Sequence, residues 1–181
     1  MHLSSLPSPH GIGSMGEPAR RFADFLKQAG QSYWQLLPVC PTSYGDSPYQ
    51  SFSTYAGNPY FIDLDELAAQ GYLKREEYEG TDWESAPDQV NYGVLYEKRY
   101  PILRTAVRRF RENPPEAYES FCRENARWLE DYACFMALKD VHGGAPWQEW
   151  ENGLRIREME ALEKARADYA DEIEFWKVCQ Y

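Results

Sequence analysis

The chain has 181 residues, of which 43% are hydrophobic and 15% aromatic, and its formal net charge is −10. This apolar content is enough for a folded core and excludes a disordered chain, and the excess of acids argues against nucleic acid or an anionic membrane as a partner. No apolar run approaches the roughly 20 residues that span a bilayer, and the opening MHLSSLPSPHGIG lacks the basic flank and apolar block of a signal peptide, so a soluble, cytoplasmic protein is expected.

The first 62 residues differ sharply in composition from the rest. They carry six of the 48 charged side chains and seven of the 12 prolines, whereas the remainder is charged and helix-like. We therefore divide the chain into three parts. Residues 1–62 form an α/β start with a binding loop, residues 63–152 a helical subdomain, and residues 153–181 the start of a long helix.

The first elements predict a βαβ unit. Apolar residues from 18 to 29 fall on one helical face, and Pro18 and Gly30 suit the two ends of that helix. The next segment, YWQLLPV at residues 33–39, is short, mostly apolar and ended by prolines, which predicts a buried strand of a parallel sheet. Residues 2–5 are interpreted as the tail of an earlier strand, so the first strand of the unit is cut short.

Helices dominate the rest of the prediction. Asp63 caps a short helix that stops at Gly71. A second helix covers residues 92–112, with Pro101 kinking or breaking it. The last two helices run from the prolines at 114 and 115 to the glycines at 143 and 144, and from Gly153 to the end of the chain, where the apolar EFWKVCQY indicates truncation.

The four cysteines are far apart in the sequence. Cys40, Cys122, Cys134 and Cys179 form no C-x-x-C pair, which is the spacing that metal or redox use requires. We expect reduced thiols, most of them buried as small hydrophobic side chains. Because the three histidines are equally scattered, a metal site is not expected.

The loop from Val39 to Ile62 combines many rings with neutral polar groups. It contains six aromatic side chains among serines, asparagine and glutamine, and Asp46 is its only charge. Flat rings edged with neutral hydrogen-bonding groups suit a hydroxyl-rich ligand such as a sugar, whereas a phosphate would require Lys, Arg or a glycine-rich nest. The alternative is a rigid Ω-loop whose rings only pack on the scaffold, as Tyr60 and Phe61 are expected to do.

Carboxylates in this region do not form a catalytic pair. Glycoside chemistry uses two acids that flank the bond. The neighbours of Asp46 in the sequence are Asp63, Asp65 and Glu66, which fit a helix cap and an acidic first turn better. We therefore expect no catalysis by this chain alone.

Among the tryptophans of the chain, Trp128 is expected in the core, whereas Trp147 and Trp150 in a loop fit either packing or binding.

The same residues resemble a known family. The stretches SYGDSPYQSFSTYAGNPYFIDL, VNYGVLYEKRYPIL, WLEDYACFMALKDVHGGAPW and EIEFWKVCQY are similar to the amino-terminal part of the 4-α-glucanotransferases (amylomaltases) of glycoside hydrolase family 77. The resemblance covers essentially the whole chain. It implies part of a (β/α)₈ barrel with a largely helical insertion, a retaining transfer of α-1,4-glucan segments between maltodextrins, and no metal or organic cofactor.

The resemblance also implies roles for individual residues. Tyr49 matches a tyrosine of the substrate groove, with Ser47 and Gln50 as polar neighbours. Asp46 matches the aspartate of the same motif and is expected to order the loop or to bind a sugar hydroxyl.

Two further tyrosines match an outer glucan-stacking site. They are Tyr44, in SYGD, and Tyr96, in GVLY; without the family, Tyr96 would be interpreted as core packing on its helix. His2 matches a histidine at the end of the family's first strand, with no role assigned.

The resemblance places the three catalytic carboxylates of the family outside this sequence. The chain is therefore expected to be an inactive amino-terminal fragment of the enzyme. The alternative is a stand-alone glucan-binding or interaction module.

Overall fold

The computed structural model describes residues 1–43, 45–86 and 88–181. The chain is mostly helical and forms two compact units, Met1–Asn113 (unit 1) and Pro114–Tyr181 (unit 2). The division between them lies inside the segment 63–152. The boundaries expected at residues 62 and 152 stay predictions.

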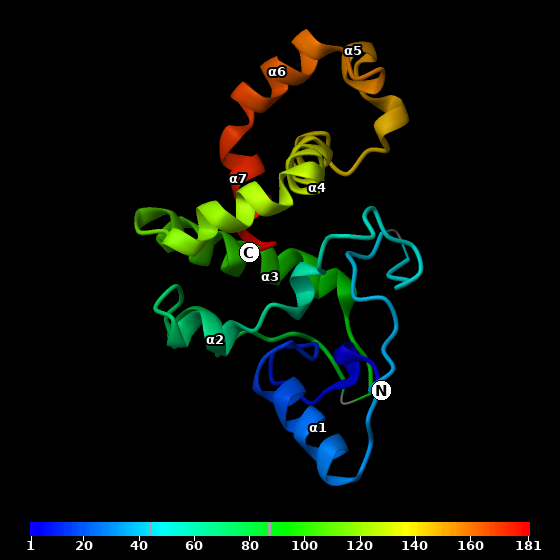
Figure 1. Ribbon diagram of the computed structural model, residues 1–181, viewed down its shortest axis with the longest axis vertical. Coiled ribbons are helices and arrows are strands. Elements are labelled where there is room, and N and C mark those ends of the chain that lie inside the picture. The colour runs from blue at the N-terminus through cyan, green and yellow to red at the C-terminus, as the bar shows by residue number, and fades with distance from the viewer. Residues whose placement is uncertain (44, 87) are drawn as a thin grey trace. The chain divides into compact units, whose positions relative to one another are not determined.

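In the described residues of unit 1, three α-helices are joined by long irregular segments (Figure 1). They are α1 (Glu17–Gln28), α2 (Leu64–Ala69) and α3 (Tyr92–Glu112), with short 3₁₀ turns η1 (Leu3–Ser5), η2 (Pro59–Phe61) and η3 (Arg75–Glu77). The core of this unit collects apolar side chains from η1, α2, the segment after it and α3: Leu3, Leu6, Ile12, Leu64, Leu73, Tyr78, Trp83, Leu95 and Leu103 are all buried.

The predicted ends of the first two helices are confirmed. α1 has a proline in its first turn, and Gly30 follows it with a φ of 73°, a left-handed conformation that glycine adopts without strain. At the start of α2, the Asp63 carboxylate accepts a 2.9 Å hydrogen bond from the backbone N–H of Glu66. Gly71, with a φ of 85°, ends it.

Of the two effects expected of Pro101, a kink or a break, the break is wrong, because α3 is one element from Tyr92 to Glu112; the kink stays a prediction. Proline removes one backbone hydrogen bond and crowds the preceding turn. Buried side chains anchor the helix on both sides of it, with Leu95 before the proline and Ile102 and Leu103 after it. Tertiary packing outweighs the local cost.

The buried strand predicted at residues 33–39 is also wrong. This segment joins no sheet, and Tyr33 is 92% exposed. Residues 3–5 form the 3₁₀ turn η1 rather than the tail of a strand, so no βαβ unit forms. Within the described ranges the only β-pairing is two isolated bridges, Thr42 with Ser51 and Ala86 with Gln89. A strand requires a neighbouring edge for its backbone groups, and unit 1 presents none to this segment.

One face of α1 is left uncovered in unit 1. Phe22 and Leu26 are partly buried and Phe25 is exposed, although the sequence places all three on the apolar stripe. The Trp34 ring packs edge-on against Phe22 at 4.8 Å. Together with residues 33–37, this face lines a hollow of about 440 Å³.

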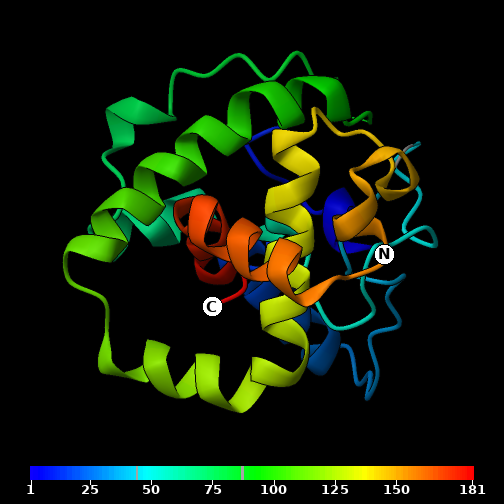
Figure 2. The ribbon, with the colours of Figure 1, turned by 90° about the horizontal axis from the view of Figure 1, so that it is seen from above.

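Unit 2 contains α4 (Glu116–Val141), η4 (Trp147–Glu149), α5 (Asn152–Arg155), α6 (Met159–Asp168) and α7 (Ala170–Val178). Figures 1 and 2 show α5 and α6 turning the chain back so that α7 packs on α4. The contact is apolar along Leu129 and Ala133, and two polar links fix its register. Trp176 Nε1 donates to Asp140 at 3.0 Å, and Lys177 Nζ pairs with Glu130 at 2.7 Å.

The expectation of one long helix from Gly153 onward is wrong, since α5, α6 and α7 are separate. Arg157 interrupts the helix with a φ of 57°, and Tyr169 separates α6 from α7 with a φ of −115°. These turns allow Phe175 and Trp176 to be buried, which a straight exposed helix does not permit.

All four cysteines are free, but only Cys134 is buried. The expectation that most of the thiols are buried is therefore wrong. Cys40 lies in the irregular segment after α1, Cys122 on a flank of α4 and Cys179 at the end of α7, and all three are partly exposed. In the described part of the chain, no helix is both long enough and apolar enough to cross a bilayer.

Candidate functional site

The aromatic loop of unit 1 (residues 40–58) closes on itself. The backbone N–H of Asn58 donates a 2.9 Å hydrogen bond to the carbonyl of Val39, which brings the two ends of the loop together. The Asn58 side chain then accepts from the N–H of Tyr60 and starts η2. The loop is therefore an Ω-loop attached to the core at Tyr60 and Phe61, both buried as predicted.

Asp46 lies in the first half of this loop, in a turn held by backbone hydrogen bonds. Its N–H donates to the carbonyl of Ser43 at 3.1 Å, and the N–H of Ser43 donates to the carbonyl of Gln50 at 2.9 Å. The φ of Asp46 is 55°, a left-handed conformation that aspartate tolerates better than most residues. These hydrogen bonds are made by the backbone, so the two roles expected of the Asp46 carboxylate, ordering the loop or binding a sugar hydroxyl, both stay predictions.

Three serine hydroxyls of the loop serve its backbone. Ser47 Oγ accepts from the N–H of Tyr49 at 3.3 Å, and Ser51 Oγ from that of Ser53 at 3.2 Å. Ser53 Oγ accepts from the N–H groups of Tyr55 and Ala56. These hydroxyls hold the shape of the loop, and the Ser51 O–H also donates to the carbonyl of Ser53 at 2.7 Å.

Beside the loop lies a tyrosine cluster, made of Tyr60, Tyr92, Tyr96 and Tyr100. The Tyr60 ring is 6.1 Å from Tyr92 and 5.8 Å from Tyr100, and Tyr100 meets Tyr96 edge to face at 5.5 Å. Three of the four follow one another at four-residue intervals on α3 and therefore share a helix face. The fourth comes from η2, directly after the loop.

Asp46 connects the loop to this cluster electrostatically. Partial burial raises the pKa of its carboxyl group, because desolvation disfavours the charged form. Burial, and next the negative charge of Asp46, raise the pKa of the hydroxyls of Tyr60 and Tyr92. The charge of Asp46 therefore acts on these phenolic hydroxyls, and carboxylate and phenol groups can both hydrogen-bond neutral hydroxyl groups.

Two of the predicted ligand-stacking rings are open to solvent. Tyr49 is 73% exposed at the tip of the loop, and Tyr96 is 60% exposed at the end of the tyrosine cluster. The interpretation of Tyr96 as core packing is therefore wrong. Gln50 is also exposed, with its backbone committed to the loop and its side chain on the surface. Tyr44 lies outside the described residues.

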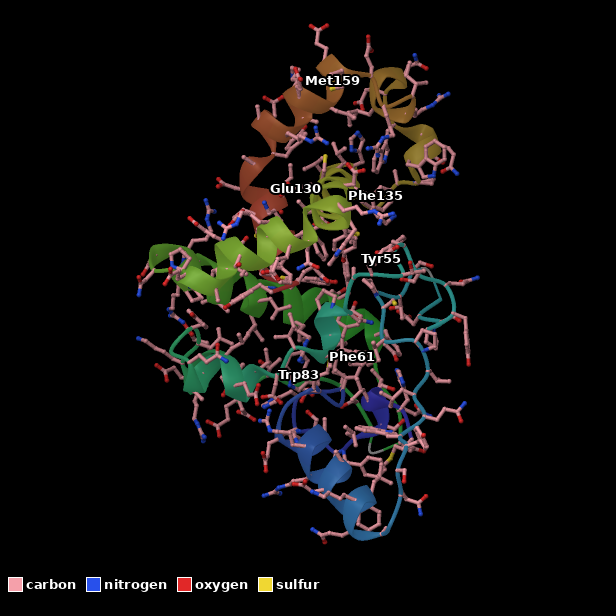
Figure 3. The ribbon with its side chains drawn as sticks, in the orientation of Figure 1. Tyr55, Phe61, Trp83, Glu130, Phe135 and Met159 are labelled. Carbon is pink, nitrogen blue, oxygen red and sulfur yellow. The ribbon has the colours of Figure 1, made fainter. Side chains whose placement is uncertain are left out.

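Of the predicted site residues, Tyr96 belongs to the cluster through its ring contact with Tyr100, and Asp46 acts on Tyr60 and Tyr92 through its charge. Among described residues, no ring contact or hydrogen bond joins Tyr49 to that cluster. Sequence reasoning missed Tyr92 and Tyr100 as its members, although their four-residue spacing around Tyr96 was a readable signal. Tyr55, labelled in Figure 3, adds another exposed ring to the loop.

The other acids near the loop have structural roles. Asp63 caps α2 and accepts a 2.5 Å hydrogen bond from the Ser14 hydroxyl. Asp65 accepts from Tyr78 at 2.7 Å and contacts His10 Nε2 at 3.1 Å. Burial raises the pKa of Asp65, but these two hydrogen bonds outweigh it and lower the pKa. Within residues 1–43, 45–86 and 88–181, no three acids, histidines or cysteines gather closely enough to hold a metal ion.

His2 lies apart from the loop. Its ring meets Phe61 edge to face at 5.5 Å, and burial together with the nearby amino terminus lowers its pKa. A neutral ring of this kind is suited to packing, and no role in a site follows from its position.

Comparison with known proteins gives a consistent result. The family model for 4-alpha-glucanotransferase, glycoside hydrolase family 77, matches residues 1–181. The chain is 42% identical to a 4-alpha-glucanotransferase of Clostridium butyricum, covering all of this chain and 37% of that protein. It is 49% identical to that of Thermus thermophilus, covering 36% of the relative. The chain therefore spans little more than a third of the length of the relatives it matches.

A solved structure agrees with the sequence relatives. The amylomaltase from Streptococcus agalactiae in complex with acarbose matches with a TM-score of 0.95 and 41% identity, over 100% of this chain and 37% of that one. A match of this quality over every residue, together with the family model, leaves one assignment. The chain belongs to glycoside hydrolase family 77, the 4-α-glucanotransferases.

Proposed function

We propose that this chain is the amino-terminal part of a cytoplasmic 4-α-glucanotransferase that transfers α-1,4-glucan segments between maltodextrins. The observation that carries the proposal is the family match over all 181 residues, combined with relatives that bear this name and are almost three times as long. No finding favours the alternative of a stand-alone glucan-binding module.

The role of this chain in the reaction is to hold the glucan. Tyr49 stacks on a sugar in the catalytic groove, and Ser47 and Gln50 hydrogen-bond its hydroxyls. Tyr44 and Tyr96 stack on a more distant part of the glucan as an outer site. The 73% and 60% exposure of Tyr49 and Tyr96 supports both roles, since a ring must be open to solvent to receive a pyranose face.

The chemistry is supplied by carboxylates elsewhere in the whole protein. A retaining double displacement requires two carboxyl groups roughly 5–5.5 Å apart on either side of the bond. In unit 1, Asp63 and Asp65 are engaged in capping and in the contacts with Tyr78 and His10. We assign Asp46 to ordering the loop or binding a sugar hydroxyl, and none of these acids to the role of nucleophile.

The uncovered parts of unit 1 fit a portion of a (β/α)₈ barrel. Residues 33–39 become a barrel strand when neighbouring strands supply the edges, and the apolar face of α1 is then covered by the barrel. The hollow of about 440 Å³ between α1 and residues 33–37 supports this, because it is lined by the side chains that such packing buries. Residues 63–152 correspond to the helical insertion, and residues 153–181, with their separate short helices, to the segment that returns to the barrel.

A chimera tests the proposal. In it, this chain replaces the corresponding part of the Streptococcus agalactiae amylomaltase, to which it is 41% identical. We expect the chimera to convert maltotriose into glucose and longer dextrins, while the isolated chain produces neither. Turnover by the isolated chain contradicts the placement of the acids.

A matched control separates folding from function. The chimera carrying Tyr49→Ala is expected to keep its thermal transition and to lose efficiency on maltotriose. A well-folded chimera without transfer activity overturns the proposed function.

A further inference from the structure

Unit 2 contains a pocket that the glucan sites do not use. Its volume is about 300 Å³, and its lining comes from α4, from η4 and the residue after it, from α5 and from α6. Small-molecule sites typically occupy about 300–1,000 Å³ and combine apolar walls with a few convergent polar groups. Both properties are present here.

The apolar side of the pocket is aromatic and held in place. Trp150 is buried, stacks on His142 at 5.0 Å, lies 5.5 Å from Phe135, and donates its Nε1–H to the carbonyl of Ala145 at 3.2 Å. Phe135 projects from α4 (Figure 3). Trp147, by contrast, is 47% exposed and supplies an accessible indole at the mouth. A flat ligand ring meets a preformed surface, which lowers the entropy lost on binding.

The polar side of the pocket is basic, in a chain whose net charge is −10. Arg155, Arg157 and Arg166 line it, and Asp131 is the one acid in the lining. Asp131 accepts from Arg157 at 2.9 Å, and Arg166 lies 3.5 Å from its other oxygen. One carboxylate therefore offsets only one of three guanidinium charges.

Most of the hydrogen-bond donors of these arginines remain for a ligand. Each guanidinium carries five N–H groups in a planar fork, and Asp131 uses a small part of those on Arg157 and Arg166. Arg155 makes no ion pair or hydrogen bond with its side chain to another described residue. Convergent guanidinium groups of this kind recognise phosphate or carboxylate oxygens by two parallel hydrogen bonds.

We propose that this pocket binds a small phosphomonoester whose phosphate is attached to a flat ring-bearing body, such as a sugar phosphate or a nucleoside monophosphate. Arg155 and the free edges of Arg157 and Arg166 hold the phosphate, and Trp147 stacks on the ring. This inference does not rest on the proposed transfer reaction, because every residue involved lies in unit 2.

Calorimetric titration of the full chain tests this with four probes: glucose 1-phosphate, adenosine monophosphate, glucose and maltose. At least one of the two phosphomonoesters is expected to bind saturably. The phosphomonoester that binds shows whether the ring-bearing body of the ligand is a sugar or a nucleoside. Binding is expected to weaken as salt rises from about 0.05 to 0.5 M, because screening reduces the attraction of the arginines. Arg155→Gln and Trp147→Ala are each expected to weaken it about tenfold or more.

Arg127→Gln is the matched control, since Arg127 is exposed on α4 and does not line the pocket. It is expected to leave the affinity within about twofold, and all variants are expected to keep the helical circular dichroism of the parent. The proposal is overturned if neither phosphomonoester binds, if glucose or maltose binds as tightly as the phosphomonoesters, if Arg155→Gln has no effect, or if maltoheptaose displaces the bound probe.

Discussion

Arg99 donates a 3.2 Å hydrogen bond from Nη1 to the backbone carbonyl of His10, a residue 89 positions earlier in the sequence. Its Nη2 donates to the carbonyl of Ile62 at 2.5 Å, and its guanidinium lies 5.8 Å from the centre of the Trp83 ring. Arg99 is fully buried, and desolvation lowers its pKa to about 10, so it remains charged at neutral pH. One side chain of α3 therefore fastens the amino-terminal segment to the exit of the aromatic loop.

Replacing Arg99 with alanine is expected to destabilise unit 1 strongly. The change leaves two buried carbonyls without their donor, each costing about 1–3 kcal/mol, and removes packing on Trp83. We expect the free energy of unfolding to fall by about 3–5 kcal/mol in urea denaturation. Arg108→Ala, at an exposed position of the same helix, is the control and is expected to stay within about 0.5 kcal/mol. Equal effects of the two changes contradict the fastening role.

Gly13 is expected not to tolerate a side chain. A Cβ atom at this position overlaps the backbone carbonyl oxygen of Leu3 and crowds Leu6, and backbone atoms cannot swing aside as a flexible side chain does. Gly13→Ala is therefore expected to lower the free energy of unfolding by about 3 kcal/mol, at the upper end for overpacking. Gly80→Ala meets no atom within 4 Å and is the matched control, expected to be nearly neutral. Thermal unfolding of both variants measures this difference in stability.

His142 is expected to make the stability of unit 2 depend on pH. Its Nδ1 faces the carbonyl of Leu138 at 2.7 Å and its Nε2 the carboxylate of Glu151 at 2.9 Å, so both nitrogens meet acceptors and only the protonated ring satisfies both. Burial alone lowers the pKa of His142, but these two hydrogen bonds outweigh it and raise the pKa above 6.5. The stabilisation is therefore complete below pH 6.5 and is lost as the pH rises through the folded-state pKa.

Comparing the chain with His142→Gln between pH 6 and pH 9 isolates this effect. The stability difference between the two proteins is expected to shrink by about 1 kcal/mol or less, because Glu151 is largely exposed and solvent screens the pair. Nuclear magnetic resonance titration of the ring reports the pKa directly. A His142 pKa below 6.5, or one that Glu151→Gln leaves unchanged, contradicts the assignment.

The exposed tyrosines are expected to control glucan affinity. Tyr49→Ala and Tyr96→Ala should each weaken binding of maltoheptaose by about 1–3 kcal/mol, the usual range for loss of a stacking ring, and Tyr44→Ala is expected to do the same. Tyr33→Ala removes a ring that is even more exposed but lies outside the loop and the cluster. Titration calorimetry should show no change for it. Weakening by Tyr33→Ala equal to that of Tyr49→Ala indicates nonspecific stacking instead.

The uncovered face of α1 is expected to cause self-association of the isolated chain. Phe25 is exposed beside Phe22, whose ring lies 6.1 Å away, and Phe22 in turn lines the hollow formed with residues 33–37. Phe25→Glu should lower the apparent mass in sedimentation at high concentration and reduce binding of an apolar dye. Gln28→Glu adds the same charge on the same helix and is expected to change neither. If the unsubstituted chain is monomeric in sedimentation at high concentration, this prediction is wrong.

Helix limits could be predicted from sequence because their signals are local. Asp63 reaches an N–H group three residues away, and Gly30 and Gly71 adopt left-handed conformations that nearly any other residue resists. The segment 33–39 shows the opposite case. Its apolar pattern predicts a strand, but a strand forms only against an edge that lies elsewhere, so composition alone was insufficient there.

The residues of the loop were identifiable because their chemistry is unusual for their position. A run of rings and hydroxyls with one carboxylate, in SYGDSPYQSFSTY, predicts a sugar-binding surface from its residue types alone. The sequence does not tell which hydroxyls are free. Ser47, Ser51 and Ser53 all accept backbone hydrogen bonds, which depends on the fold of the loop.

By itself, then, the sequence of this protein determined the family, the main helices and the ring-rich loop, because each of them depends on residues that are neighbours in the sequence or on long specific motifs. Only the tertiary structure brought the charge of Asp46 to bear on Tyr60 and Tyr92, buried Arg99 against carbonyls from two distant segments, and placed three arginines and Trp147 in the lining of one pocket. Those relationships join residues that are well separated along the chain, and they arise from the packing of whole helices, which no local pattern records.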